Sequence, residues 1–205
     1  MRLFVLSEAL MSKVYKVNEL FYSIQAEGRY AGTPAVFVRL AGCNLDCPFC
    51  DTNHAPFVEM SKEDIEQKVA ELDPTGEAIV VFTGGEPTLQ LADDEIICPN
   101  RVRTIETNGI ITAPSWIHHV TISPKIKLPQ DKLATANELK FLYGWFEDDY
   151  LSEVEQFARK MNIECYIQPL AKDDNSFDAI PAVEFAKQHP YWRLSLQFHK
   201  LINIQ

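Results

Sequence analysis

The chain has 205 residues, of which 46% are hydrophobic and 23% charged, and a formal net charge of −10. This length predicts one domain with a substantial core. The acidic balance argues against nonspecific binding to nucleic acid, because there is no basic excess to neutralise phosphates. No run of about 18 apolar residues predicts a membrane span, and residues 1–12 show no secretory cleavage site. We therefore expect one cytoplasmic domain over residues 1–205, of which residues 1–12 could be an N-terminal extension.

Short β-branched or aromatic runs recur along the chain and predict strands. Their near-continuous hydrophobicity is typical of parallel strands that are buried on both faces. The runs cover residues 35–40, 78–82, 102–107, 119–124, 138–143, 163–168 and 192–197.

Helices are predicted between some of these strands, over residues 61–72, 152–161 and 180–188. The first begins with Ser61 followed by Asp64, the spacing of a capping box. Alternating strands and helices indicate an α/β fold with a parallel sheet. A complete eightfold barrel takes about 250 residues, so we expect a partial TIM-like barrel with a reduced set of helices and functional groups at the carboxyl ends of its strands.

Three of the five cysteines, Cys43, Cys47 and Cys50, lie close together directly after the first predicted strand. Clustered thiols in a reducing compartment indicate a metal site rather than disulfides. A zinc site with His54 as fourth ligand is one possibility. The other is a [4Fe–4S] cluster with one iron left open for a substrate or cofactor. The remaining two cysteines lie in apolar surroundings and are expected to be buried thiols: Cys98 and Cys165.

The cysteine spacing, with Phe49 directly before Cys50, resembles the cluster motif of the radical S-adenosylmethionine superfamily. The sequence "FTGGEP" at residues 82–87 resembles the motif that cradles the amino group of S-adenosylmethionine there. Gly84 and Gly85 permit close backbone approach, and Glu86 offers an anionic acceptor for an ammonium. A tight turn before a helix would also explain these residues.

Polar residues close the next predicted strands. At successive strand ends they form a ring around one mouth, and the resemblance implies that they contact S-adenosylmethionine. They occur in "ETNG", "SPK" and "QPL": Glu106, Asn108, Ser123, Lys125 and Gln168.

Residues 21–52 and 192–205 resemble the two ends of the 7-carboxy-7-deazaguanine synthase family. The resemblance implies ring contraction of 6-carboxy-5,6,7,8-tetrahydropterin to 7-carboxy-7-deazaguanine with loss of ammonia, started by a 5′-deoxyadenosyl radical. It also implies a flavodoxin- or ferredoxin-type electron donor and a homodimer. Two alternatives are another small radical S-adenosylmethionine enzyme, such as a glycyl-radical activase, and a zinc-binding interaction module without catalysis.

The same resemblance assigns the pterin pocket. Gln25 and Glu27 would read the donor–acceptor edge of the pterin, together with the backbone of Ile24 and Ala26. Ala26 replaces the family's usual glycine, which is tolerable only with a negative φ. Thr83, just before the glycines, is expected to contact the substrate.

Charged groups complete this predicted pocket. Arg39 is a natural bidentate partner for the substrate carboxylate, although a structural ion pair would also explain it. Thr52 matches a Mg²⁺-binding position, where substrate oxygens would complete the octahedron; a turn hydroxyl is the alternative. His199 and the main-chain carboxylate of Gln205 are expected to reach the substrate.

Overall fold

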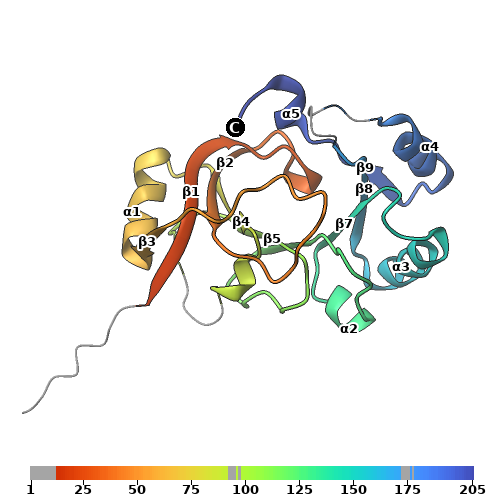
Figure 1. Cartoon of the computed structure of the whole chain (residues 1–205), viewed down its shortest axis with the longest axis horizontal. Coiled ribbons are helices and arrows are strands. Elements are labelled where there is room, and N and C mark those ends of the chain that lie inside the picture. Colours follow the sequence, from red (N-terminus) through yellow and green to blue (C-terminus); the bar gives the residue numbers. More distant parts are fainter. Residues whose placement is uncertain (1–12, 92–95, 97, 172–175, 177) are drawn as a thin grey trace, which may run out of the picture.

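The computed structural model describes residues 13–91, 96, 98–171, 176 and 178–205. These residues form a nine-stranded sheet in the order β3-β1-β2-β4-β5-β6-β7-β8-β9. The strands from β2 through β4 to β9 are parallel, whereas β1 pairs antiparallel with β2 and with β3. The sheet curls into an open ring (Figure 1). Its strands are β1 Val14–Ile24, β2 Pro34–Leu40, β3 Val58–Ser61, β4 Ile79–Gly84, β5 Arg103–Thr107, β6 His119–Ile122, β7 Glu138–Leu142, β8 Glu164–Gln168 and β9 Trp192–Leu194.

All seven predicted strands are present as the parallel part of the sheet, so the partial TIM-like barrel is confirmed. The last one was predicted too long, because β9 ends at Leu194 and the chain then turns into a helix. β1 and β3 were not predicted. β1, with the sequence "VYKVNELFYSI", buries alternate residues in its first half and reads less clearly as a strand than the apolar runs do.

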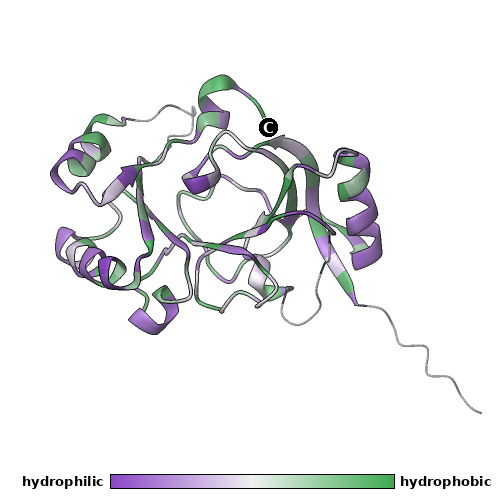
Figure 2. Ribbon diagram, turned by 180° about the vertical axis from the view of Figure 1, so that it is seen from behind, coloured by the Kyte–Doolittle hydropathy of each residue, from purple (hydrophilic) through white to green (hydrophobic). Residues whose placement is uncertain are grey.

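The helices lie around the outside of the ring. They are α1 Lys62–Leu72, α2 Gln130–Leu133, α3 Asp148–Met161, α4 Ile180–Gln188 and α5 Phe198–Ile202, with 3-10 turns at Gly28–Tyr30 and Pro87–Leu89. The predicted capping box is confirmed, since Asp64 N donates to Ser61 Oγ at 3.1 Å and Ser61 N donates to Asp64 Oδ2 at 3.0 Å. Figure 2 shows hydrophilic residues on the helices at the periphery.

The reduced set of helices is also confirmed. Residues 108–118, all of which the structure describes, connect β5 to β6 without a helix. In the described part of the chain, no helix is long and apolar enough to cross a membrane. Residues 1–12, the predicted extension, lie outside the described residues.

The open side of the ring, between β9 and the β1–β2 hairpin, is filled by loops and by α5 (Figure 1). The hairpin loop, residues 25–33, is held there by the segment that follows β9. Gly28 N donates to Ser195 Oγ at 3.3 Å, and Gln197 Nε2 donates to Glu27 Oε1 at 3.0 Å. Side-chain contacts thus link the two ends of the ring, which strand pairing does not join.

Candidate active site

A pocket of about 1210 Å³ lies where the parallel strands end. Its wall also includes the cysteine loop, residues 41–57, which crosses the centre of the ring in Figure 1. With the exception of Glu86, all of the predicted site residues line this one pocket: Ile24, Gln25, Ala26, Glu27, Arg39, Cys43, Cys47, Phe49, Cys50, Thr52, Thr83, Gly84, Gly85, Glu106, Asn108, Ser123, Lys125, Gln168, His199 and Gln205.

The three clustered cysteines have accessible thiols. Cys43 and Cys47 are half-buried and Cys50 is exposed. In the described residues, no three His, Cys, Asp or Glu side chains converge as ligands of a single metal ion. The donor set fits a [4Fe–4S] cluster, because its thiolates bind different irons and need not meet at one point.

The other two thiols are buried, as predicted. Burial raises the pKa of Cys98 to about 11 and that of Cys165 to about 12. Both side chains belong to the hydrophobic core. They are therefore packing residues rather than ligands.

The glycine turn after β4 packs on the beginning of the cysteine loop. Gly85 N donates to Leu40 O at 3.1 Å. A Cβ on Gly85 would overlap the carbonyl group of Gly42, and a Cβ on Gly84, whose φ is +140°, would overlap the backbone of Leu40. The close approach that requires these glycines is therefore made to the chain's own backbone, which places the turn beside the cysteines.

Glu86 lies outside the pocket and is fully buried. Its Oε1 accepts hydrogen bonds from Thr88 N at 3.0 Å, Thr88 Oγ1 at 2.5 Å and Thr107 Oγ1 at 2.7 Å. Its Oε2 accepts one from Asn108 N at 2.7 Å. The carboxylate therefore joins the glycine turn to the end of β5. This differs from the predicted contact of Glu86 with an ammonium, since the carboxylate has no exposed surface and does not line the pocket.

A second wall of the pocket carries a half-buried cation. Lys125 Nζ donates to Ser123 Oγ at 2.7 Å. Burial, reinforced by the positive charge of Lys140, lowers the pKa of Lys125 to about 8. Trp145 Nε1 donates to Lys125 O at 2.9 Å, and its ring meets Phe49 edge-on with centroids 4.6 Å apart. Phe49 thus ties the cysteine loop to the chain segment that follows β6.

Two amides connect the rim of the pocket to neighbouring segments. Asn108 Nδ2 donates to Asn44 Oδ1 of the cysteine loop at 2.7 Å. Gln168 Oε1 accepts from Ser195 Oγ at 2.9 Å. Each amide keeps part of its hydrogen-bonding capacity free for a ligand.

The hairpin loop lines another part of the pocket wall. Gln25 Nε2 donates to Glu106 Oε1 at 3.1 Å, and Glu27 N donates to Gln25 Oε1 at 3.1 Å. Thr83 Oγ1 donates to Glu106 Oε2 at 3.3 Å. Ala26 is buried and has a negative φ, which is the condition under which a methyl group can replace the usual glycine. Glu106 was predicted to contact S-adenosylmethionine, yet its carboxylate faces residues predicted to contact the pterin.

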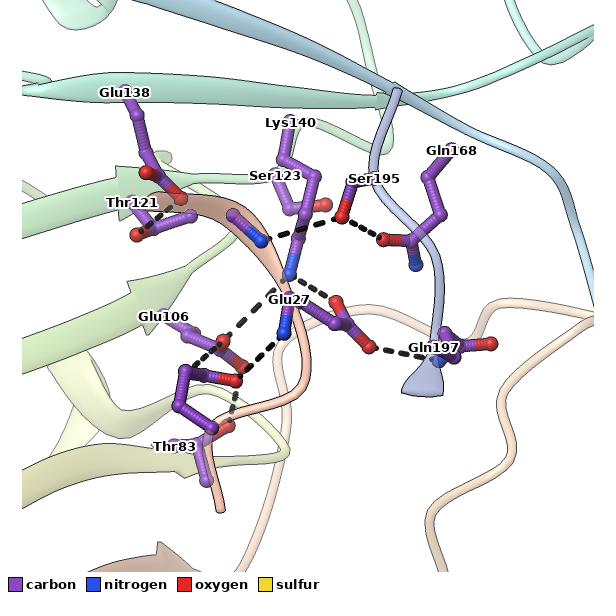
Figure 3. A network of polar contacts seen from close by, with 12 residues as sticks. Glu27, Thr83, Glu106, Thr121, Ser123, Glu138, Lys140, Gln168, Ser195 and Gln197 are labelled. Carbon is purple, nitrogen blue, oxygen red and sulfur yellow. Dashed lines mark hydrogen bonds and ion pairs between the residues drawn. The ribbon is translucent and has the colours of Figure 1, made fainter. Parts of the chain in front are cut away.

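Sequence reasoning missed Lys140, which projects from β7 between two carboxylates (Figure 3). Its Nζ forms an ion pair with Glu27 and lies 3.6 Å from Glu106 Oε1. Although burial alone would raise the pKa of Glu27, the ammonium of Lys140 and hydrogen bonds from Lys140 and Gln197 lower it to about 2. Glu27 is therefore a carboxylate at neutral pH. The sequence signal was the alternation of Glu138 and Lys140 with apolar neighbours, which indicates a polar inner face of β7.

Arg39 lies near the edge of the pocket. Its Nε donates to Glu19 Oε2 at 2.9 Å across the β1–β2 pair. Arg39 therefore forms the structural ion pair that was the alternative explanation for this residue. Another guanidinium nitrogen is 3.4 Å from Thr52 Oγ1. Thr52 Oγ1 lies 3.4 Å from Asp51 Oδ1, and Asp51 is paired with Lys200. Both the guanidinium and the Thr52 hydroxyl remain accessible to the pocket.

The C-terminal segment forms another part of the pocket wall. His199 sits on α5, and burial lowers its pKa against the opposing charge of Glu27. Ser23 Oγ donates to the main-chain oxygen of Gln205, which fixes this residue against the end of β1.

Comparison with known proteins identifies this arrangement. The model of the Radical SAM superfamily matches residues 37–138. The 7-carboxy-7-deazaguanine synthase of Bacteroides thetaiotaomicron is 38% identical over 93% of this chain and 98% of its own length. That of Burkholderia multivorans is 36% identical over 93% and 99%. The crystal structure of QueE from Escherichia coli superposes with a TM-score of 0.69 and 27% identity, over 90% of this chain and 94% of that one.

Proposed function

The chain belongs to the 7-carboxy-7-deazaguanine synthase family of radical S-adenosylmethionine enzymes, and from this premise we propose how its pocket divides the work of that reaction. The enzyme is a lyase that contracts the ring of 6-carboxy-5,6,7,8-tetrahydropterin to 7-carboxy-7-deazaguanine with loss of ammonia, in queuosine-type biosynthesis. It uses a [4Fe–4S] cluster and S-adenosylmethionine.

The cysteine side of the pocket holds the cofactors. Cys43, Cys47 and Cys50 would hold the cluster, which together with S-adenosylmethionine would supply the radical chemistry. The glycine turn offers backbone groups to the cofactor, and Lys125 presents an ammonium beside it. The remaining contacts to S-adenosylmethionine come from the ring of strand ends: Phe49, Asn108, Ser123 and Gln168, with Glu86 acting through its position behind the turn.

The hairpin side holds the pterin. Glu27, ionised by its neighbours, accepts hydrogen bonds from the N–H groups of the pterin, while Gln25 contributes an amide. Arg39 binds the substrate carboxylate, for which it exchanges or shares its contact with Glu19. Thr83 and His199 flank the ring, together with the backbone of Ile24, Ala26 and Gln205.

We assign Mg²⁺ to Thr52. The neighbouring carboxylate of Asp51 lies within reach of the same site, and oxygen ligands of this kind are what Mg²⁺ prefers. The carboxylate of the pterin would bring Arg39 and the ion to the same group, which orients the substrate at one end. Its other end is then held by Glu27.

The observation that carries the proposal is that one pocket joins the three cysteines to the hairpin loop and the C-terminal segment. Anaerobic reconstitution should give about four irons per chain, and incubation with the pterin, S-adenosylmethionine, a reductant and Mg²⁺ should yield 7-carboxy-7-deazaguanine. Cys50→Ala should lose both iron and product, whereas the buried Cys165→Ala should keep both. A fully loaded enzyme that makes no deazaguanine would refute the assignment.

We further propose the cytoplasm as the location, a flavodoxin- or ferredoxin-type protein as the electron donor, and a homodimer as the assembly. A reducing compartment suits the accessible thiols. One catalytic domain over residues 1–205 completes the proposal, and sedimentation together with reduction assays would test the partners.

A further inference from the structure

Lys140 is a charged residue in the middle of a core strand. Its side chain is 6% exposed, and the adjacent Leu139 and Phe141 on β7 are fully buried. An apolar side chain of similar length would fill this position without the cost of removing an ammonium from water. The lysine therefore requires an explanation beyond packing.

The contacts of Lys140 provide one. Its ammonium lies between Glu27 from the hairpin loop and Glu106 from β5, both of which line the pocket. Figure 3 shows the lysine projecting from its strand to a point where the two carboxylates converge. The hairpin and the sheet are thus joined by one buried cation.

The remaining bonds of the two carboxylates come from pocket residues as well. Glu27 Oε1 accepts from Gln197 Nε2 at 3.0 Å, and Glu106 Oε1 accepts from Gln25 Nε2 at 3.1 Å. Two carboxylates on one wall of a pocket repel each other. The cation between them offsets this repulsion and holds both groups in place as hydrogen-bond acceptors.

We propose that Lys140 is a positioning and specificity-determining residue for the pterin, which acts through Glu27 and Glu106 by fixing both carboxylates at the pocket wall. This inference rests on the proposed function, because it takes Glu27 as a residue that binds the pterin. A pocket with two fixed acceptors selects a heterocycle that presents N–H donors and rejects one that presents acceptors at that edge.

The charged groups that face Glu27 come from several elements. They are Lys140 on β7, His199 on α5, Glu106 on β5, Asp51 in the cysteine loop and Lys125 after β6. Of these, Lys140 makes the direct ion pair. Without it, burial dominates and the pKa of Glu27 rises toward the neutral range, as it does for other buried glutamates. Protonation then replaces an acceptor by a donor.

The test measures pterin binding against pH in reconstituted enzyme with S-adenosylmethionine but no reductant. In wild-type enzyme, His199, Lys125 and the pterin itself can all titrate, so the wild-type profile is the reference against which each variant is compared. Lys140→Met should add an acid limb, along which the Kd rises about tenfold for each pH unit below the new pKa. Lys140→Arg keeps the charge and should show no acid limb, even where its size weakens binding. Glu27→Gln combined with Lys140→Met should abolish the limb.

Further measurements separate positioning from folding. Iron content and S-adenosylmethionine affinity of Lys140→Met should match wild type, and its KM for the pterin should change more than its kcat. The exposed Lys127→Met is the matched control, since it loses only surface contacts, the pair with Glu147 and a cation–π contact with Tyr150. A Lys140→Met enzyme whose pterin binding weakens equally at all pH values, or not at all, would overturn the inference. Wild-type turnover of the pterin tests the proposed function separately, so the two failures are distinguishable.

Discussion

Replacing Glu86 by glutamine would test whether this residue of the glycine turn is structural. The carboxylate has no exposed surface and accepts only from donors of its own chain. In Glu86→Gln, one oxygen becomes an NH₂ group. The backbone N–H groups of Thr88 and Asn108 face opposite oxygens and cannot turn away, so either orientation of the amide sets one N–H against another.

The magnitude follows from these bonds. Losing one hydrogen bond to a charged acceptor costs about 1.5–3 kcal/mol, and leaving a buried N–H without an acceptor adds about 1–3 kcal/mol. Because the two effects overlap in one contact, we expect a loss of about 3–5 kcal/mol in the free energy of unfolding. For a chain of this length, each kcal/mol corresponds to about 2–4 °C, which gives a fall in Tm of about 6–20 °C.

Thermal unfolding of the metal-free protein, followed by circular dichroism, measures this without any contribution from a cofactor. Glu63→Gln, at an exposed position in the first turn of α1, serves as the matched control and should leave Tm nearly unchanged. If Glu86→Gln unfolds at the wild-type temperature while S-adenosylmethionine binding is lost, the structural reasoning is wrong and the side chain contacts the cofactor directly.

Three further predictions follow from the same structure. Gly85→Ala should lower the free energy of unfolding by about 1–3 kcal/mol and lower the iron bound per chain, because its Cβ would push the carbonyl of Gly42 and the cysteine loop. The control Gly76→Ala has a strained φ but no atom near the added Cβ, and it should keep its iron. Asp73→Asn should destabilise by about 3–5 kcal/mol in denaturant unfolding, because it leaves the buried Arg101 without its carboxylate. Although burial opposes it, hydrogen bonds from Thr75 and Arg101 hold the pKa of Asp73 well below its usual range. The stabilisation from the ionised Asp73 is therefore present above about pH 4 and is lost as the pH falls below that. The difference in the free energy of unfolding between wild type and Asp73→Asn should shrink in acid. A difference that stays constant with pH would contradict this.

The parallel strands were predictable because a strand buried on both faces is a short apolar run bounded by polar residues. The end of such a run also marks where functional groups gather, which is why the predicted site residues other than Glu86 meet in one pocket. β1 was not predictable in this way. Only its first half alternates between buried and exposed positions, and its identity as a strand depends on pairing with β2 and β3.

The contacts that sequence reasoning could not supply are those set by tertiary pairing. The motif that contains Glu86 indicated an ammonium acceptor, but only the fold shows that the carboxylate is fully buried and accepts from Thr88, Thr107 and Asn108. Arg39 likewise looked like a free carboxylate binder, whereas the antiparallel register places Glu19 opposite it. In both cases the residue type was informative, but its partner depended on which strands are neighbours.

The polar interior of the ring explains why pairing matters so much here. A closed eightfold barrel fills its interior with apolar layers, whereas this open ring places Lys140, Glu106 and Glu27 at its centre. Each charge is tolerable only because the others compensate it, and none would be stable alone. The hairpin that brings Glu27 to the sheet is therefore required both for the charge balance of the interior and for the wall of the pocket.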